Sequence, residues 1–345
     1  MTDINIGFLG EQAVNEIRRV GVIGAGTMGN GIAHVFARSG YHVVLCEVEQ
    51  RFLDRGLETL RKNLEREAAK GKITVDDAQD SLARVTGVLD RERLADCDFV
   101  IEAATEKFEI KKAIFTDLDR ITRKDVILAS NTSSISVTKL AHVTSRPDRV
   151  IGMHFFNPVP MMKLVEVIRG MATSQETYDQ VRDLAVKLEK TPVEVNDAPG
   201  FVSNRVLMPL LNEAMYAVME GVATREAVDE VFKLGMAHPM GPLTLADFIG
   251  PTFVWTLCAC CRKDSATQSI ARARYWFEWS MPGGWAASPA VVSINTERLL
   301  RTLVLLHEPA VVGWLSIIGT KSGGTLIQHR ASPANFADDQ RAGIL

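Results

Sequence analysis

The sequence predicts an α/β fold: a doubly wound, mostly parallel sheet, followed by an all-helical second domain that is only partly present. A short apolar run at Arg19–Ile23 has the pattern of a buried parallel strand and leads directly into a glycine-rich stretch at 24–29. Apolar runs and helical stretches then alternate up to about residue 196, which is typical of βαβ units. From Asp197 onward, apolar residues recur every three or four positions, which indicates helices alone.

The remaining elements are placed by the same patterns. Strands are expected at Arg19–Ile23, Tyr41–Cys46, Phe99–Ala103, Val126–Ser130, Val150–Met153 and Lys163–Ile168. Helices are expected at Asn30–Ser39, Arg51–Lys72, Ile110–Leu118, Phe201–Met219 and Thr224–Lys233. Gly40 ends the first helix, and Pro199-Gly200 marks a hinge into the helical domain.

The glycine-rich stretch reads Gly24-Ala25-Gly26-Thr27-Met28-Gly29 and joins the first strand to the first helix. Gly24 permits a tight turn, Gly26 lets the backbone approach a pyrophosphate at the helix N-terminus, and Gly29 allows helix and strand to pack closely. A lone pattern of this kind is weak, but here strand, glycines, helix and second strand follow in register. The stretch, with Thr27 and Met28, is predicted to bind a dinucleotide in a Rossmann-like domain.

Glu47 closes the second strand, 23 residues after the first glycine of the motif. A carboxylate at this position accepts hydrogen bonds from both hydroxyls of the adenosine ribose and repels a 2′-phosphate. The predicted cofactor is therefore NAD rather than NADP.

The expected strand at Val150–Met153 leads directly into His154, and Glu166 lies on the next strand after a short turn, so the two residues are expected to face each other. A carboxylate beside a histidine fixes its tautomer and stabilises the imidazolium that forms when the histidine takes a proton. The pair therefore suits general-base catalysis. The alternative is a strand histidine that is hydrogen-bonded for structural reasons alone.

Six segments together resemble the 3-hydroxyacyl-CoA dehydrogenase family over about residues 17–250. They read VGVIGAGTMGNGIA, VIEAATEKFEIKKAIF, SNTSSIS, RVIGMHFFNPVPMMKLVEVI, DAPGFVSNRV and HPMGPLTLADFIG. The resemblance implies a short-chain enzyme that oxidises (S)-3-hydroxyacyl-CoA, most simply 3-hydroxybutyryl-CoA, to 3-oxoacyl-CoA with NAD, in fatty acid or butyrate metabolism. It also implies a homodimer, formed through the helical domain.

The resemblance assigns roles to individual residues. His154 is the general base and Glu166 its orienting partner, while Ser133 and Asn204 position the reacting oxygen and the thioester. The nicotinamide half of NAD is contacted by Glu106, Lys111 and Asn157, with Ser133 near the cofactor as well. Lys62 and Arg66, in the charged helical stretch, are matched to the CoA phosphates.

The composition of the chain changes after Gly250, and its resemblance to the family ends there. All five tryptophans lie after it, and the family's expected ending, GWLGRKxGxGFYxY, is absent. When codons are built from the third base of one residue and the first two of the next, residues 281–296 permit AGWLGRKSGRGFYQY. We infer that residues 251–345 are translated in a shifted frame after loss of one base, and expect them to be poorly ordered. A genuine, different C-terminal domain is the alternative.

The predicted organisation is an N-terminal extension at 1–16, a NAD-binding domain at 17–196, the start of the helical domain at 197–250, and the tail. With a net charge of −3 and no apolar run long enough to span a bilayer, neither nucleic acid nor a membrane is an expected partner. No signal peptide is recognised, so a cytoplasmic location is expected. The cysteines lack metal-site spacing, and no metal is predicted.

Two other functions remain open at this point. A relative acting on a sugar acid such as L-gulonate shares His154 and Glu166, and dependence on CoA discriminates the two. A chain that binds NAD but cannot turn over, because its second domain is scrambled, is the non-enzymatic alternative. For the same reason, dimerisation and activity of the 345-residue chain are doubtful.

Overall fold

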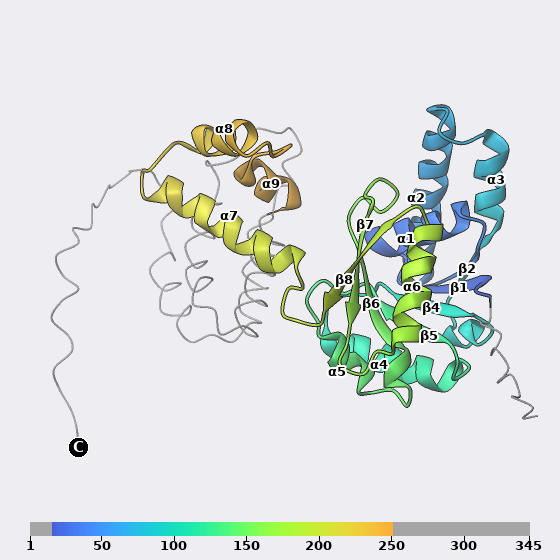
Figure 1. The fold of residues 1–345 in the computed structure, drawn as a ribbon. Coiled ribbons are helices and arrows are strands. Elements are labelled where there is room, and N and C mark those ends of the chain that lie inside the picture. The colour runs from blue at the N-terminus through green and yellow to red at the C-terminus, as the bar shows by residue number, and fades with distance from the viewer. Residues whose placement is uncertain (1–15, 251–345) are drawn as a thin grey trace, which may run out of the picture. The chain divides into compact units, whose positions relative to one another are not determined.

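The computed structural model describes residues 16–250, and their core is an eight-stranded sheet (Figure 1). The strands are β1 Arg19–Ile23, β2 His42–Cys46, β3 Val85–Val88, β4 Phe99–Glu102, β5 Ile127–Ser130, β6 Val150–Phe155, β7 Leu164–Arg169 and β8 Thr191–Asn196. Their order is β3-β2-β1-β4-β5-β6-β7-β8. The ladders are parallel except the one between β6 and β7, so the predicted doubly wound, mostly parallel sheet is confirmed.

Helices cover both faces of this sheet. Those of the first domain are α1 Thr27–Arg38, α2 Gln50–Ala69, α3 Val75–Ala83, α4 Phe108–Ile121, α5 Val137–Ala141 and α6 Gln175–Lys187. Apolar residues of α1, α2 and α6 share one buried cluster with the sheet, and those of α4 and α5 share a second. The central strands contribute to both clusters. In β2, for example, Val43 and Leu45 belong to the first cluster and Val44 to the second. Burial on both faces explains why the strands read as continuous apolar runs.

Five elements of the first domain were not predicted from the sequence: α3, β3, α5, α6 and β8. The two strands are the edges of the sheet and are largely exposed or half-buried, so they lack a continuous apolar run. β8 even contains Pro192, which an edge strand tolerates because one of its sides needs no ladder hydrogen bond.

From Ser203 the described chain is helical, as predicted. Its helices are α7 Ser203–Met219, α8 Arg225–Gly235 and α9 Pro242–Ile249, and they bury two small apolar clusters of their own. The Asp229 carboxylate accepts the Leu243 and Thr244 amides at 2.8 and 3.0 Å, which caps the start of α9. None of the described helices has the length and apolarity to cross a membrane. The expectations for the N-terminal extension and for the tail after Gly250 concern residues outside the described range, apart from residue 16.

Candidate active site

The glycine-rich turn has the geometry that dinucleotide binding requires. Gly24 has a φ of +96°, and its amide donates to the Cys46 carbonyl at 2.8 Å, which brings the turn against the end of β2. A Cβ on Gly29 would collide with the Gly24 carbonyl, so only glycine lets α1 start here. A Cβ on Gly26 would meet nothing within 4 Å, which leaves the N-terminus of α1 open for a phosphate.

Glu47 lies beside this turn, at the tip of β2. Its Oε2 accepts the Ala25 amide at 2.8 Å and its Oε1 accepts the Val48 amide at 2.7 Å. These bonds hold the carboxylate at the rim of the dinucleotide site, and its contact with the ribose stays a prediction.

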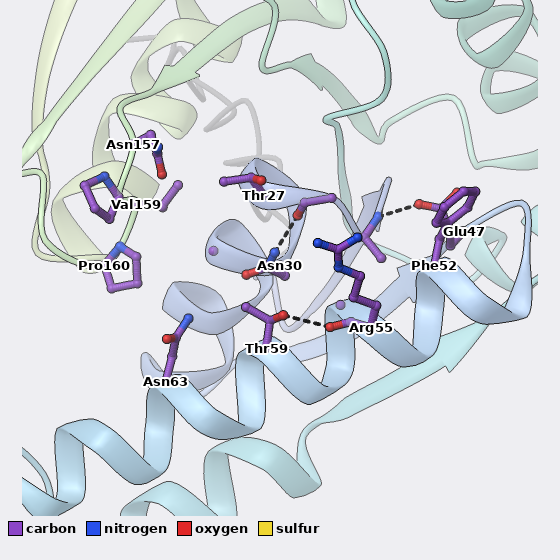
Figure 2. Close-up of a pocket in the computed structure, with 15 residues that line it drawn as sticks. Thr27, Asn30, Glu47, Phe52, Arg55, Thr59, Asn63, Asn157, Val159 and Pro160 are labelled. Atoms are coloured by element: carbon purple, nitrogen blue, oxygen red, sulfur yellow. Dashed lines mark hydrogen bonds between the residues drawn. The ribbon is translucent and has the colours of Figure 1, made fainter. Parts of the chain in front are cut away.

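A cavity of about 460 Å³ opens over the turn (Figure 2). Its walls are the glycine turn with Thr27 and Glu47, one face of α2, and the loop at 157–160 that follows β6. The first turn of α1 holds no acidic residue, so the helix presents only amides and a positive dipole end to an anion. The residues present therefore fit a dinucleotide.

Helix α2 forms one wall of the cavity. This wall is formed by Phe52, Arg55, Gly56, Thr59 and Asn63, which share one helix face, and Figure 2 shows Arg55 rising from it toward the turn. None of these residues was predicted from the sequence, although their spacing of about three to four residues indicates a shared helix face.

The two α2 residues matched to CoA phosphates do not line this cavity. Lys62 is exposed and paired with Glu58 at 3.1 Å, while Arg66 reaches Asn63 Oδ1 at 3.4 Å. Arg66 therefore borders the cavity wall through Asn63. A role for either residue with CoA stays a prediction.

His154 and Glu166 are direct partners across the antiparallel β6–β7 ladder. Opposed residues in such a ladder have their Cβ atoms about 5 Å apart, which lets the side chains meet. His154 Nδ1 lies 2.8 Å from Glu166 Oε2, and both side chains are buried. His154 and Glu166 therefore face each other, as the sequence predicts.

Glu166 has two more donors, both from Ser203 at the start of α7. The Ser203 amide donates to Oε1 and its hydroxyl to Oε2, each at 2.9 Å. Burial opposes ionisation of Glu166, but His154 and Ser203 outweigh it and hold the pKa of that carboxyl below its usual value. No pattern in the sequence indicated Ser203 as part of this site.

Asn204 and Ser133, predicted to position the substrate, are joined by a hydrogen bond. Asn204 Nδ2 donates to the Ser133 carbonyl at 3.1 Å, so α7 contacts both the dyad and the loop after β5. Asn131 of that loop accepts the Phe155 amide through Oδ1 at 2.9 Å, which ties it to the strand that carries His154.

Glu106 organises the loop after β5. It accepts the Ser133 and Ser134 amides at 2.9 Å and the Thr132 hydroxyl. Burial works against the charge, but the Lys111 ammonium and these donors hold the pKa of Glu106 below its usual value. The carboxylate therefore stays ionised at neutral pH.

Lys111 is buried beneath Glu106 rather than open to the cavity. Its ammonium donates to Glu102 at 2.7 Å, lies 3.3 Å from Glu106 Oε2, and its side chain is 1% exposed. Asn157, in contrast, is exposed and lines the cavity. The Lys111 ammonium also donates to the Ala104 carbonyl at 3.2 Å, so Lys111 holds the loop after β4 as well as Glu106.

Cysteine and metal chemistry have no support in residues 16–250. Cys46 and Cys97 are free and buried, and burial raises the pKa of Cys46 to about 11 and that of Cys97 to about 12. Within this range, no group of three or more metal-ligating side chains gathers.

Comparison with known proteins decides the family. A model described as "3-hydroxyacyl-CoA dehydrogenase, NAD binding domain" matches residues 19–198, and one described as the C-terminal domain of the same family matches 200–281. The chain belongs to the 3-hydroxyacyl-CoA dehydrogenase family. It is an NAD-dependent oxidoreductase with a Rossmann-like first domain. The second match extends past Gly250, so the proposed boundary at that residue stays a prediction.

Individual family members are similar over most of their length. A "Probable 3-hydroxybutyryl-CoA dehydrogenase" of Bacillus subtilis is 55% identical over 235 residues, which is 68% of this chain and 82% of the relative. The 3-hydroxybutyryl-CoA dehydrogenase of Bradyrhizobium diazoefficiens is 50% identical over 234 residues, 68% of this chain and 80% of that one. The crystal structure of an (S)-3-hydroxybutyryl-CoA dehydrogenase from Ralstonia eutropha superposes with a TM-score of 0.74 at 46% identity, covering 76% and 93% of the two chains.

Proposed function

We propose that this dehydrogenase oxidises (S)-3-hydroxybutyryl-CoA to acetoacetyl-CoA, with His154 as the general base. The observation that carries the proposal is the 2.8 Å bond between His154 Nδ1 and Glu166. With Nδ1–H directed to a carboxylate, Nε2 is left as the nitrogen that accepts a proton. The names of relatives at 50–55% identity supply the substrate class.

In this mechanism the protein supplies the base and the positions of the reactants. His154 removes the proton of the 3-hydroxyl, and ionised Glu166 stabilises the imidazolium that forms. Ser133 and Asn204 orient the reacting oxygen and the thioester, while Glu106 and Asn157 hold the cofactor end of the site. NAD, when bound, supplies the hydride acceptor.

Two finer expectations belong to the same proposal. We expect the active enzyme to be a homodimer and to lie in the cytoplasm. We also propose the shifted frame after Gly250, so each experiment below uses two proteins. One is the 345-residue chain, and the other, called the base-restored protein, is expressed from the same gene with one base added after the Gly250 codon.

The test is a set of matched variants assayed with acetoacetyl-CoA and NADH. His154→Gln and Glu166→Gln should each lower kcat by roughly 100-fold or more, the usual size of general-base catalysis, while NADH affinity stays nearly unchanged. His142→Gln, at an exposed histidine, is the control and should keep full activity. Near-normal kcat in His154→Gln would show that the base has been misassigned.

Two further measurements, oxidation of L-gulonate with NAD and titration with NADH, separate the alternatives. Oxidation of L-gulonate without any response to CoA thioesters would favour the sugar-acid relative. NADH binding without turnover in the 345-residue chain, combined with turnover in the base-restored protein, would favour the non-catalytic alternative for the chain.

A further inference from the structure

Ser203 contacts the dyad carboxylate through two different groups. Its amide donates to Glu166 Oε1 at 2.9 Å, and its hydroxyl donates to Oε2 at 2.9 Å. The oxygen that receives the hydroxyl is the one that bonds His154 Nδ1. The carboxylate is thus held at both of its oxygens by one residue.

We propose that Ser203 is a positioning residue, which fixes the rotation of the Glu166 carboxylate and thereby the orientation of the His154 ring. The inference rests on the proposed function of the dyad. A carboxylate on a two-carbon side chain rotates about its terminal bond, because that torsion has no sharp minimum. Donors on both oxygens remove this freedom.

The location of Ser203 adds an electrostatic contribution. It is the first residue of α7, a helix of 17 residues, so its amide belongs to the unsatisfied donors at the positive end of the helix. Glu166 satisfies this amide in place of a capping side chain, since Val202 at the N-cap provides none. The helix terminus therefore favours the ionised carboxylate that the histidine needs.

The neighbours of Ser203 serve the same site. Phe201 lies with its ring centroid 6.0 Å from that of His154, and Asn204 donates to the Ser133 carbonyl. A single turn at the start of α7 thus confines the histidine ring, orients its carboxylate and anchors the loop after β5. Loss of the Ser203 hydroxyl should loosen only the Glu166 carboxylate, and not the His154 ring contact or the loop after β5.

The test compares Ser203→Ala, which lacks the hydroxyl donor, with Ser203→Thr, which keeps it. Ser39→Ala, at the end of α1 and outside the site, is the matched control. If Ser203→Ala does not fold, Ser203→Cys replaces it, because a thiol is only a weak donor. All variants are made in the 345-residue chain and in the base-restored protein.

Two readouts are needed, one of which does not depend on turnover. Nitrogen-15 shifts of the His154 ring, assigned with His154→Gln, report which ring nitrogen carries the proton at pH 8. We expect the Nδ1–H tautomer in the parent protein and in Ser203→Thr, and a mixture of tautomers in Ser203→Ala. The kcat of Ser203→Ala should fall about 10-fold, the size of one lost hydrogen bond to a charged group, with KM for NADH unchanged.

The pH profile distinguishes a positioning role from a merely structural one. Once its carboxylate can rotate away from Nδ1, Glu166 should stabilise the imidazolium less. In the reduction of acetoacetyl-CoA, where His154 gives up a proton, the alkaline limb of kcat/KM should therefore move to lower pH in Ser203→Ala. An unchanged tautomer and an unchanged pH profile in Ser203→Ala would overturn the inference. The proposed function would survive that result, because it depends on His154→Gln alone.

Discussion

The ammonium of Lys190 lies 2.6 Å from the carbonyl oxygen of Val159 and 2.8 Å from that of Met162. Lys190 precedes β8 and is buried, so it ties this edge of the sheet to the loop at 157–160 that lines the dinucleotide cavity. Lys190→Met should leave two carbonyls without their donor. We expect it to weaken NADH binding about 5- to 10-fold, on the scale of one lost charged hydrogen bond, as measured by fluorescence titration.

Two comparisons make that prediction specific. Lys190→Arg keeps a donor in the same place and should recover most of the affinity. Lys187→Met removes an exposed lysine of α6 and should change nothing. Equal NADH affinity in Lys190→Met and the parent protein would mean that the loop needs no anchor.

Glu47 should determine the choice between NAD and NADP. A 2′-phosphate beside its carboxylate should cost on the order of 1–3 kcal/mol, or roughly 5- to 150-fold in affinity. The parent protein should therefore bind NADH more tightly than NADPH, and Glu47→Ser should narrow the difference. Equal affinity of the parent protein for NADH and NADPH would show that Glu47 does not contact the adenosine ribose.

Most of the sheet could be predicted because central strands are buried on both faces and give unbroken apolar runs. β3 and β8 could not, since edge strands mix polar and apolar residues. Spacing placed His154 opposite Glu166. Spacing alone could not identify Ser203. A serine at the start of a helix looks like an ordinary cap in the sequence, and its bond to Glu166 is a tertiary contact.

Burial was harder to predict than position. Lys111 reads in the sequence as one more charge on a helix, yet its side chain is 1% exposed and paired with Glu102. A charged side chain is rarely buried unless it pairs with a group from another element. Such a tertiary contact cannot be predicted from the local sequence. The family resemblance found Lys111, and the structure shows that it lies under Glu106 rather than in the cavity.

His34 should make the fold sensitive to mild acid. Its ring is fully buried, and its Nδ1 has no hydrogen-bond partner within the described part of the chain. Burial lowers the pKa of His34 from 6.5, and this outweighs the opposing attraction of Glu67. Below about pH 6.5 the unfolded chain therefore takes up a proton that the folded chain resists, so stability falls as pH falls.

The measurement is the melting temperature at pH 7.5 and 5.5. His34→Gln stays neutral at both values, so its melting temperature should drop less between them than that of the parent, by a few degrees. His142→Gln, at an exposed position, should behave as the parent. An equal drop in all three proteins would assign the acid sensitivity to other groups.

The proposed frame shift makes a prediction about the gene and one about the product. Sequencing of the coding DNA around the Gly250 codon should show whether one base is missing. The base-restored protein should be a soluble dimer that oxidises 3-hydroxybutyryl-CoA, whereas the 345-residue chain should be largely insoluble or inactive, because its tail was never selected to cover the apolar faces of the helices. Comparable activity and a cooperative unfolding transition in the 345-residue chain would show that its tail is a genuine domain.

The ladder between β6 and β7 has a consequence for how such an enzyme can diversify. His154 and Glu166 are aligned by backbone hydrogen bonds between their strands, not by the eight-residue excursion that separates those strands at Phe155 and Leu164. That excursion borders the nucleotide cavity. The side chains of this loop can therefore be substituted to suit another ligand, in evolution or by design, without changing the His154–Glu166 pair. The one condition is that the carbonyls bound by Lys190 remain in place.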